Sequence, residues 1–152
     1  MTFTPGTDPS HADLEQRVHA SFSRQQLMRT LGASLTSVLP GVVELELPFR
    51  DDLTQQHGYL HAAAITAIVD SACGYAAMTR MPPGTEVLSV EFKVNLLAPG
   101  RGERFVAVGR VVRAGRTLTV CTGEGFAIQD GERKPICVMQ ATMIASRTGG
   151  QE

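Results

Sequence analysis

The sequence has no tryptophan, few aromatic residues and no excess of either charge. It contains six phenylalanines and two tyrosines, and its 14 Lys and Arg are offset by 15 Asp and Glu, for a net charge of −1. Proteins that bind nucleic acid through its phosphates normally carry a basic excess, so we expect no nucleic-acid partner. Cysteine is also scarce: Cys73, Cys121 and Cys137 lie far apart without a CxxC pair. This spacing argues against a disulfide framework and against a cysteine-rich zinc site.

No secretory signal and no clear membrane span are visible in the sequence. No basic-then-apolar segment opens the sequence, so we expect no secretory signal and the reducing cytoplasm as the compartment. Gly58–Thr79 has no Lys, Arg or Glu, but Asp70 lies near its middle. A carboxylate is costly at the centre of a bilayer. We therefore interpret this stretch as a buried helix and expect no membrane partner.

What is present is an ordinary globular composition, with 43% hydrophobic and 19% charged residues over 152 positions. That length favours one domain with a substantial core. We expect this domain over residues 10–146, between flexible tails at 1–9 and 147–152. No internal repeat and no linker divides it.

Hydrophobic periodicity predicts an N-terminal helix, one strand and a long central helix. The first helix is expected to be capped by Ser10 and to run to a C-cap at Gly32. Val43–Leu47 alternates apolar and acidic residues up to Pro48, which predicts a half-buried strand. The central helix is expected to start at Ala62. Its apolar stripe has nearly perfect helical spacing: Ile65, Ile68, Val69, Ala72, Cys73, Ala76 and Ala77.

After this helix the period changes to two, which predicts four long antiparallel strands. The expected strands are 89–96, 104–112, 117–128 and 136–145, with turns at Arg113–Arg116 and Asp130-Gly131 and with Pro135 at the start of the last strand. The fold class is therefore α+β, with a curved antiparallel sheet around a long central helix, plus an N-terminal helix. Because that helix is apolar on almost every face, one sheet cannot enclose it. We expect a second copy of the chain to cover it, in a homodimer or a dimer of dimers.

Asp70 is the strongest candidate for chemistry. It is the only acidic residue between Asp52 and Glu86, and no basic residue lies within two helical turns of it. Burying an unpaired carboxylate is unfavourable unless it has a purpose. Desolvation would raise its pKa toward the useful range of a general base. The alternative is a structural carboxylate that caps backbone groups or pairs with an arginine.

The start of the same helix offers groups that polarise a carbonyl. The first helical amides, which follow His61, have no partner within the helix and lie at the positive end of its dipole. Taken alone, His61 fits a helix cap better than a catalytic role. His57 lies four residues before it, but no further ligand follows at metal spacing, so we expect no metal. Nine residues, or about 13 Å of helix, separate His61 from Asp70. If both act on one substrate, they come from different chains.

Several motifs of other enzyme classes are absent. The sequence has no Gly-x-Ser-x-Gly elbow, no Gly-x-Gly-x-x-Gly and no phosphate loop, and we expect no cofactor. Cys73 lies among alanines, where we expect an inert buried thiol. Arg113 and Arg116 flank a hairpin tip, which is either a solvated turn or a docking point for a phosphate.

The sequence from Val42 to Ala145 resembles the hotdog-fold acyl-CoA thioesterases of the phenylacetate-degradation type. The resemblance rests on three segments: Gly58-x-Leu60-His61-Ala62-Ala63, Asp70 nine residues after the histidine, and Ser89–Asn95 followed by Ala98-Pro99. It implies the hotdog fold, an acid on the central helix at Asp70 and an oxyanion donor at the Ala62 amide. It also implies that Gln55, three residues before Gly58, positions the water or the carbonyl.

The same resemblance implies that Ser89 assists the water and that coenzyme A contacts fall on Arg113–Leu118, which includes Gly115 and Arg116. Two features depart from the family pattern. Ala62-Ala63 stands where a pair of glycines is common, which narrows the site beside the thioester. Ser89 shares its strand parity with solvent-side residues, so it reaches the site only if a partner covers that face or the strand begins irregularly.

We therefore expect hydrolysis of an acyl-CoA to the free acid and coenzyme A. A thiol with a pKa of about 8.5 leaves as thiolate with little acid assistance, so an activated water and an oxyanion donor suffice. Asp70 is the expected general base, with direct nucleophilic attack by its carboxylate left open. The alternatives are an enoyl-CoA hydratase or dehydratase that uses His61 with Asp70, and a non-catalytic acyl-CoA-binding protein.

Overall fold

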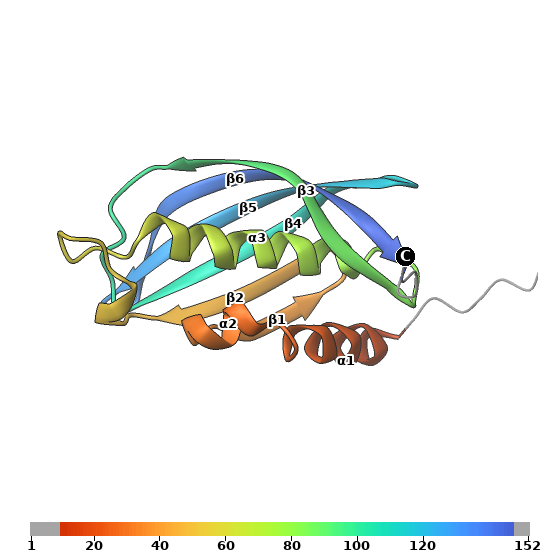
Figure 1. Ribbon diagram of the computed structural model, residues 1–152, viewed down its shortest axis with the longest axis horizontal. Coiled ribbons are helices and arrows are strands. Elements are labelled where there is room, and N and C mark those ends of the chain that lie inside the picture. The colour runs from red at the N-terminus through yellow and green to blue at the C-terminus, as the bar shows by residue number, and fades with distance from the viewer. Residues whose placement is uncertain (1–9, 148–152) are drawn as a thin grey trace, which may run out of the picture.

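The computed structural model describes residues 10–147, which form a six-stranded antiparallel sheet curved around one long helix (Figure 1). The strand order is β1-β2-β4-β5-β6-β3. This architecture confirms the expected fold class. The elements are α1 (His11–Phe22), α2 (Gln26–Leu31), β1 (Ser34–Leu39), β2 (Val42–Pro48), the 3-10 turn η1 (Asp51–Leu53), α3 (Ala62–Met78), β3 (Thr85–Leu96), β4 (Arg104–Ala114), β5 (Leu118–Gln129) and β6 (Glu132–Arg147).

The N-terminal segment forms two helices, so the prediction of one continuous helix to Gly32 is wrong. Ser10 does cap α1, through a reciprocal capping box with Asp13. α1 ends at its C-cap, Ser23, whose hydroxyl donates a hydrogen bond to the Ala20 carbonyl. Such hydrogen bonds from a side chain to the backbone compete with those of the helix. Gly32 ends the second helix in the left-handed conformation, as expected. The apolar stripe continues across the break because both helices pack on the same core.

Strand β1 was not predicted. It lies at an edge of the sheet and pairs with β2. Of its six residues only Val38 is buried, and three of the others are Ser or Thr. A strand with so few buried positions lacks the alternation by which strands are found in a sequence.

Helix α3 begins at Ala62 as predicted, and one chain covers its two halves to different degrees. Residues 71–79 are all buried, whereas Ala63 is exposed and Thr66, Ala67 and Asp70 are half-buried. These four positions share one face of the helix. The opposite face packs closely on the sheet. Within residues 10–147, no helix is long and apolar enough to cross a bilayer.

Strand β3 contains a bulge at Val90. Ser89 pairs with Met143 and the next pair joins Glu91 to Thr142, so Val90 is one extra residue in the strand. An inserted residue reverses the alternation of side chains on either side of it.

The bulge explains why Ser89 reaches the helix. Before it, Val87 and Ser89 face α3: Val87 packs against the core and Ser89 contacts Asp70. After it, Val94 packs against the core and Phe92 pairs with the buried Ala141. The strand therefore begins irregularly, which was one of the two conditions for Ser89 to lie in the site.

Strand β6 is longer than predicted at both ends. It begins at Glu132, after a hairpin turn in which Asp130 and Gly131 have positive φ values, as expected. Pro135 lies inside the strand, which is tolerated because β3 pairs only from Cys137 onward. At the other end Arg147 pairs with Thr85, so the expected tail does not begin at residue 147. The remaining expected tail residues, 1–9 and 148–152, lie outside the described part of the chain.

Candidate active site

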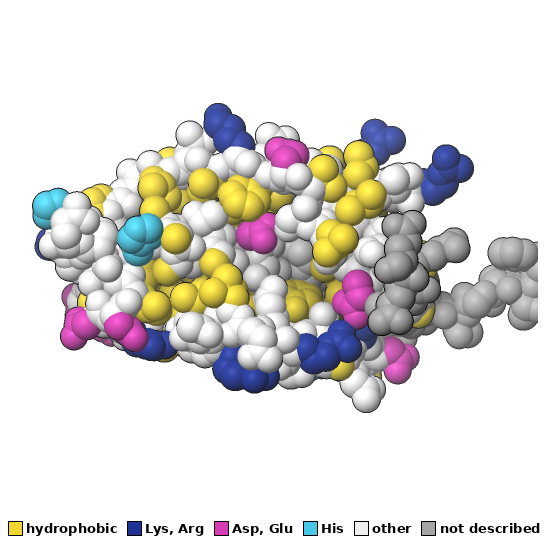
Figure 2. Space-filling model, in the orientation of Figure 1, with side chains coloured by type: hydrophobic (Ala, Val, Ile, Leu, Met, Phe, Trp, Pro, Cys, Tyr) yellow, Lys and Arg dark blue, Asp and Glu magenta, His cyan; other side chains and the backbone are white. Residues whose placement is uncertain are grey.

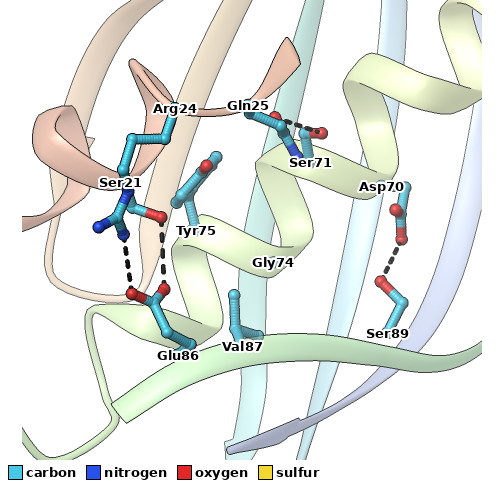
Figure 3. Close-up of a pocket in the computed structure, with 10 residues that line it drawn as sticks. All are labelled: Ser21, Arg24, Gln25, Asp70, Ser71, Gly74, Tyr75, Glu86, Val87 and Ser89. Atoms are coloured by element: carbon cyan, nitrogen blue, oxygen red, sulfur yellow. Dashed lines mark hydrogen bonds and ion pairs between the residues drawn. The ribbon is translucent and has the colours of Figure 1, made fainter. Parts of the chain in front are cut away.

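A cavity of about 260 Å³ lies between α3, β3 and the turn that joins α1 to α2 (Figure 3). Asp70 and Ser89 form one end of it. The Ser89 hydroxyl donates a hydrogen bond of 2.8 Å to Oδ1 of Asp70. The other lining residues are Ser21, Arg24, Gln25, Ser71, Gly74, Tyr75, Glu86 and Val87.

The Asp70 carboxyl group is suited to accept a proton. Partial burial raises its pKa above the ordinary value for aspartate, and the hydrogen bond from Ser89 opposes this rise. None of the ion pairs found among residues 10–147 involves Asp70. A carboxylate with raised basicity and no cationic partner can act as a general base or as a nucleophile.

His61 forms the N-cap of α3. Its Nδ1 accepts a 2.9 Å hydrogen bond from the Ala63 amide, and its side chain is exposed to solvent. The capping bond requires Nδ1 to be unprotonated. The amide of Ala62, the first of the helix, donates to no group of the described chain. It lies at the positive end of the helix dipole, which favours negative charge beside it.

Gln55 lies at the same cavity as that amide. Both Gln55 and Ala62 line a second cavity of about 500 Å³, together with Tyr59, Leu60, Ile65, Leu96, Leu97, Ala98, Pro99, Gly100 and Ile136. The Gln55 side chain accepts a hydrogen bond from the His57 amide. Gly58 closes the turn with a φ of 78°, a left-handed conformation that favours glycine. This turn holds Gln55 next to the start of α3.

The arginines of the β4–β5 turn lie at the other end of the molecule. Arg113 and Arg116 are exposed, and Arg116 lines a groove with Pro82, Pro83, Gly84 and Thr85, which follow the C-terminal end of α3. Gly115 allows a tight turn, since a Cβ there would lie 2.7 Å from the Leu118 carbonyl oxygen. The 17 residues of α3 span about 26 Å, so this turn is far from Gln55.

The residues predicted for the site thus fall into three groups within one chain. Gln55, Gly58, His61 and Ala62 lie at the start of α3, Asp70 and Ser89 at its middle, and the arginine turn beyond its end. Six polar residues of the Asp70 cavity were missed: Ser21, Arg24, Gln25, Ser71, Tyr75 and Glu86. Ser71 and Tyr75 lie on α3 with Asp70, so helical spacing could have found them. The other four come from the N-terminal helices and β3, and no sequence spacing relates them to Asp70.

No group of three His, Cys, Asp or Glu gathers as metal ligands within the described residues. Cys73 is buried as predicted, and desolvation strongly raises the pKa of its thiol. The same cause raises the pKa values of Cys121 and Cys137 to about 11. Thiols of such low acidity are poor nucleophiles at neutral pH.

A long helix enclosed by a curved antiparallel sheet is the hotdog fold, and comparison with known proteins agrees. The structure of the PaaI protein of Escherichia coli, from the phenylacetic acid degradation operon, superposes with a TM-score of 0.77 at 19% identity, over 90% of this chain and 94% of that one. At this identity the likeness supports the fold alone.

Sequence comparison identifies the family. Residues 57–134 match the family model of the thioesterase superfamily, and the chain belongs to that superfamily. A thioesterase family protein from Silicibacter pomeroyi is 52% identical, with a TM-score of 0.85 over 87% of this chain and 97% of that one. Human acyl-coenzyme A thioesterase 13 is 28% identical over 109 residues, covering 69% of this chain and 76% of the human one. The expected class of enzyme, a thioester hydrolase, is confirmed.

Proposed function

We propose that the protein hydrolyses an acyl-CoA thioester and that Asp70 is the general base that activates the attacking water. The observation that carries this proposal is the Asp70–Ser89 pair: a carboxylate of raised pKa lies in a cavity and makes no ion pair among residues 10–147. The deprotonated carboxylate takes a proton from water as the water attacks the carbonyl carbon. The thiolate of coenzyme A then leaves with little acid assistance.

The oxyanion donor in this proposal is the Ala62 amide of a second chain. Within one chain, eight residues of helix, or about 12 Å, separate Ala62 from Asp70. The two residues also line different cavities. One carbonyl group cannot contact both within a single chain, so a complete site requires two copies.

The free edge of β3 supports such a dimer. β3 ends the sheet, and within residues 10–147 no strand pairs with its outer edge. Val90, Phe92 and Leu96 are all exposed there, at 53%, 43% and 56%. Figure 2 shows hydrophobic side chains gathered over α3 and β3 on this face, with most charged groups nearer its rim. Exposed apolar groups on an unpaired strand favour pairing with another chain.

Antiparallel pairing of two β3 strands reverses the direction of the partner's α3. The start of one α3 then lies nearer the middle of the other, which is what the shared site needs. The same operation moves the partner's arginine turn toward the Gln55 cavity, where Arg113 and Arg116 would contact the phosphates of coenzyme A.

A thiol-release assay over a panel of acyl-CoAs tests the function. We expect turnover by the wild type and a loss of about 10²–10⁴-fold in kcat for Asp70→Asn, the usual contribution of a general base. Glu132→Gln, which alters an exposed carboxylate at the start of β6, is the control and should keep full activity. Single-turnover hydrolysis in isotopically labelled water distinguishes the base from the nucleophile, because a nucleophilic Asp70 would acquire the label.

Unchanged turnover in Asp70→Asn would contradict the proposal. Hydration of an enoyl-CoA without thiol release would replace it with a hydratase. Tight binding of acyl-CoA with no product would indicate a binding protein.

A further inference from the structure

The end of the cavity opposite Asp70 is polar, and part of it is built by a segment that the family match does not include. The end of α1 contributes Ser21 and the α1–α2 turn contributes Arg24 and Gln25, whereas the match begins at residue 57. Figure 3 shows Ser21, Arg24 and Glu86 together on the side away from Asp70, with Gly74 and Val87 between the two ends.

An ion pair organises this polar end. The Arg24 guanidinium lies 2.8 Å from Oε1 of Glu86, and the Ser21 hydroxyl donates to Oε2 of the same carboxylate at 3.5 Å. A second contact crosses the cavity nearby, where the Ser71 hydroxyl donates to the Gln25 side-chain oxygen at 3.3 Å. An acyl group that extends from a thioester at Asp70 therefore meets hydrogen-bonding groups at its far end.

The cavity limits the size of that acyl group. A volume of about 260 Å³ is larger than the roughly 150 Å³ that holds one benzene molecule, but small for an extended fatty chain. A long alkyl chain would extend past the ion pair into water, where its apolar surface stays exposed and gains no hydrophobic stabilisation.

The charge of the polar end selects for neutral groups. Arg24 and Glu86 offset each other, so neither a carboxylate nor an ammonium group on the acyl chain finds an unpaired counter-ion. The pair is partly exposed, with side-chain exposures of 68% and 35%, and such pairs are weak. Its polar atoms can therefore share a hydrogen bond with a ligand, and a hydroxyl group can both donate to Glu86 and accept from Arg24.

We infer that the Arg24–Glu86 pair determines acyl specificity, selecting compact acyl groups that carry a neutral hydrogen-bonding group, such as a hydroxyl, at the end distant from the thioester. This inference rests on the proposed function, since it assigns the acyl group of the same reaction. Both residues are specificity determinants that touch the substrate and take no part in the bond-breaking step.

The test compares alkanoyl-CoAs from butanoyl to octanoyl with their terminally hydroxylated counterparts. For the length that spans the cavity, we expect the wild type to favour the hydroxylated substrate about fivefold in kcat/KM, the size expected from one added hydrogen bond. The double variant Arg24→Leu/Glu86→Leu should erase or reverse this preference. Arg24→Ala, which alters only an exposed side chain, should also weaken the preference for the hydroxylated substrate. It provides a second variant that keeps the fold.

A matched control comes from another ion pair outside the cavity. Arg104 and Glu46 join β4 to β2 at 3.0 Å with exposures of 42% and 36%, and Arg104→Leu/Glu46→Leu should leave the preference unchanged. The inference is overturned if the wild type shows no preference at any length, or if the Arg24 and Glu86 variants retain it while Asp70→Asn still abolishes hydrolysis. If the wild type releases no thiol from any acyl-CoA, the proposed function fails and the inference fails with it.

Discussion

The two halves of α3 differ in what covers them. The C-terminal half is enclosed by its own chain: residues 71–78 are all buried against the sheet, β3 and the N-terminal helices. The N-terminal half has the same alanine-rich composition, yet it keeps an exposed to half-exposed face from Ala63 to Asp70. Composition alone therefore does not decide which part of an apolar helix a single chain buries.

In the proposed mechanism, this difference separates the half of α3 that stabilises the fold from the half that carries the reacting groups. The enclosed half anchors the sheet, and the open half carries the free amide of Ala62 and the carboxylate of Asp70. A site built on the open half can be completed by a partner without disturbing the core. The following predictions test this division, beginning with the enclosed half.

The largest effect is expected at Gly109, where β4 touches the enclosed half. A Cβ at this position would overlap the backbone of Ala72 and Cys73, which cannot move without displacing the helix. We expect Gly109→Ala to lower the free energy of unfolding by more than about 3 kcal/mol or to prevent folding. Denaturant unfolding measures this. Gly74→Ala is the control, because its nearest neighbour is Val87 at 3.7 Å; in a helix interior it should stabilise by about 0.5–1 kcal/mol. Equal stabilities for the two variants would contradict the close contact.

On the open half, Ala62→Pro removes one amide proton with little change of backbone. Proline is well tolerated at the first position of a helix, and His61 already has the extended conformation that a following proline requires. Loss of an oxyanion donor should lower kcat by about 10²–10³-fold, measured by thiol release, with little change in Tm.

Mixing two inactive variants tests the shared site directly. If Asp70 and Ala62 of one site come from different chains, refolding Asp70→Asn together with Ala62→Pro yields heterodimers with one intact site each. Thiol release should then recover in part. A mixture that stays inactive, although exchange of subunits is verified, would place both groups within one chain and exclude the shared site.

A smaller effect is expected at Ser89. Its hydrogen bond lowers the pKa of Asp70, so Ser89→Ala should raise that pKa further. A general base works in its deprotonated form, and activity is lost as the pH falls through its pKa. The acid limb of the pH–rate profile should therefore move to higher pH, with a loss of about tenfold in kcat from one charge-assisted hydrogen bond. Ser89→Thr, which keeps the hydroxyl, should show the acid limb at its wild-type pH. A limb that does not move would show that Asp70 is not the titrating base.

Much of the fold could be predicted from the sequence because its hydrophobic periods are strong. The start of α3 at Ala62 and the turn at Asp130-Gly131 follow from a regular stripe and from turn chemistry. The strand β1 and the break after Phe22 could not be predicted. Strand β1 has too few buried residues to show an alternating pattern. The helix break is hidden because the apolar residues on both sides of it keep helical spacing.

The geometry of the candidate site was predictable where its residues are close in sequence. His61, Ala62 and Asp70 lie at the start and the middle of one predicted helix, so helix geometry alone gave the distances between them. The polar end of the Asp70 cavity was not predictable, because Arg24 and Glu86 meet only after the N-terminal helices fold across β3. The inward position of Ser89 depends on a bulge that strand alternation cannot reveal.

In the proposed mechanism, that bulge makes the number of residues in β3 important for the site. In a regular strand, Ser89 and Phe92 would point to opposite sides, and only one of them could face α3. With Val90 inserted, the hydroxyl beside Asp70 and the aromatic ring near the open edge both lie on the helix side. Removing this one residue would force the chain to choose between them. Anyone who grafts or shortens this strand must therefore count its residues before choosing their identities.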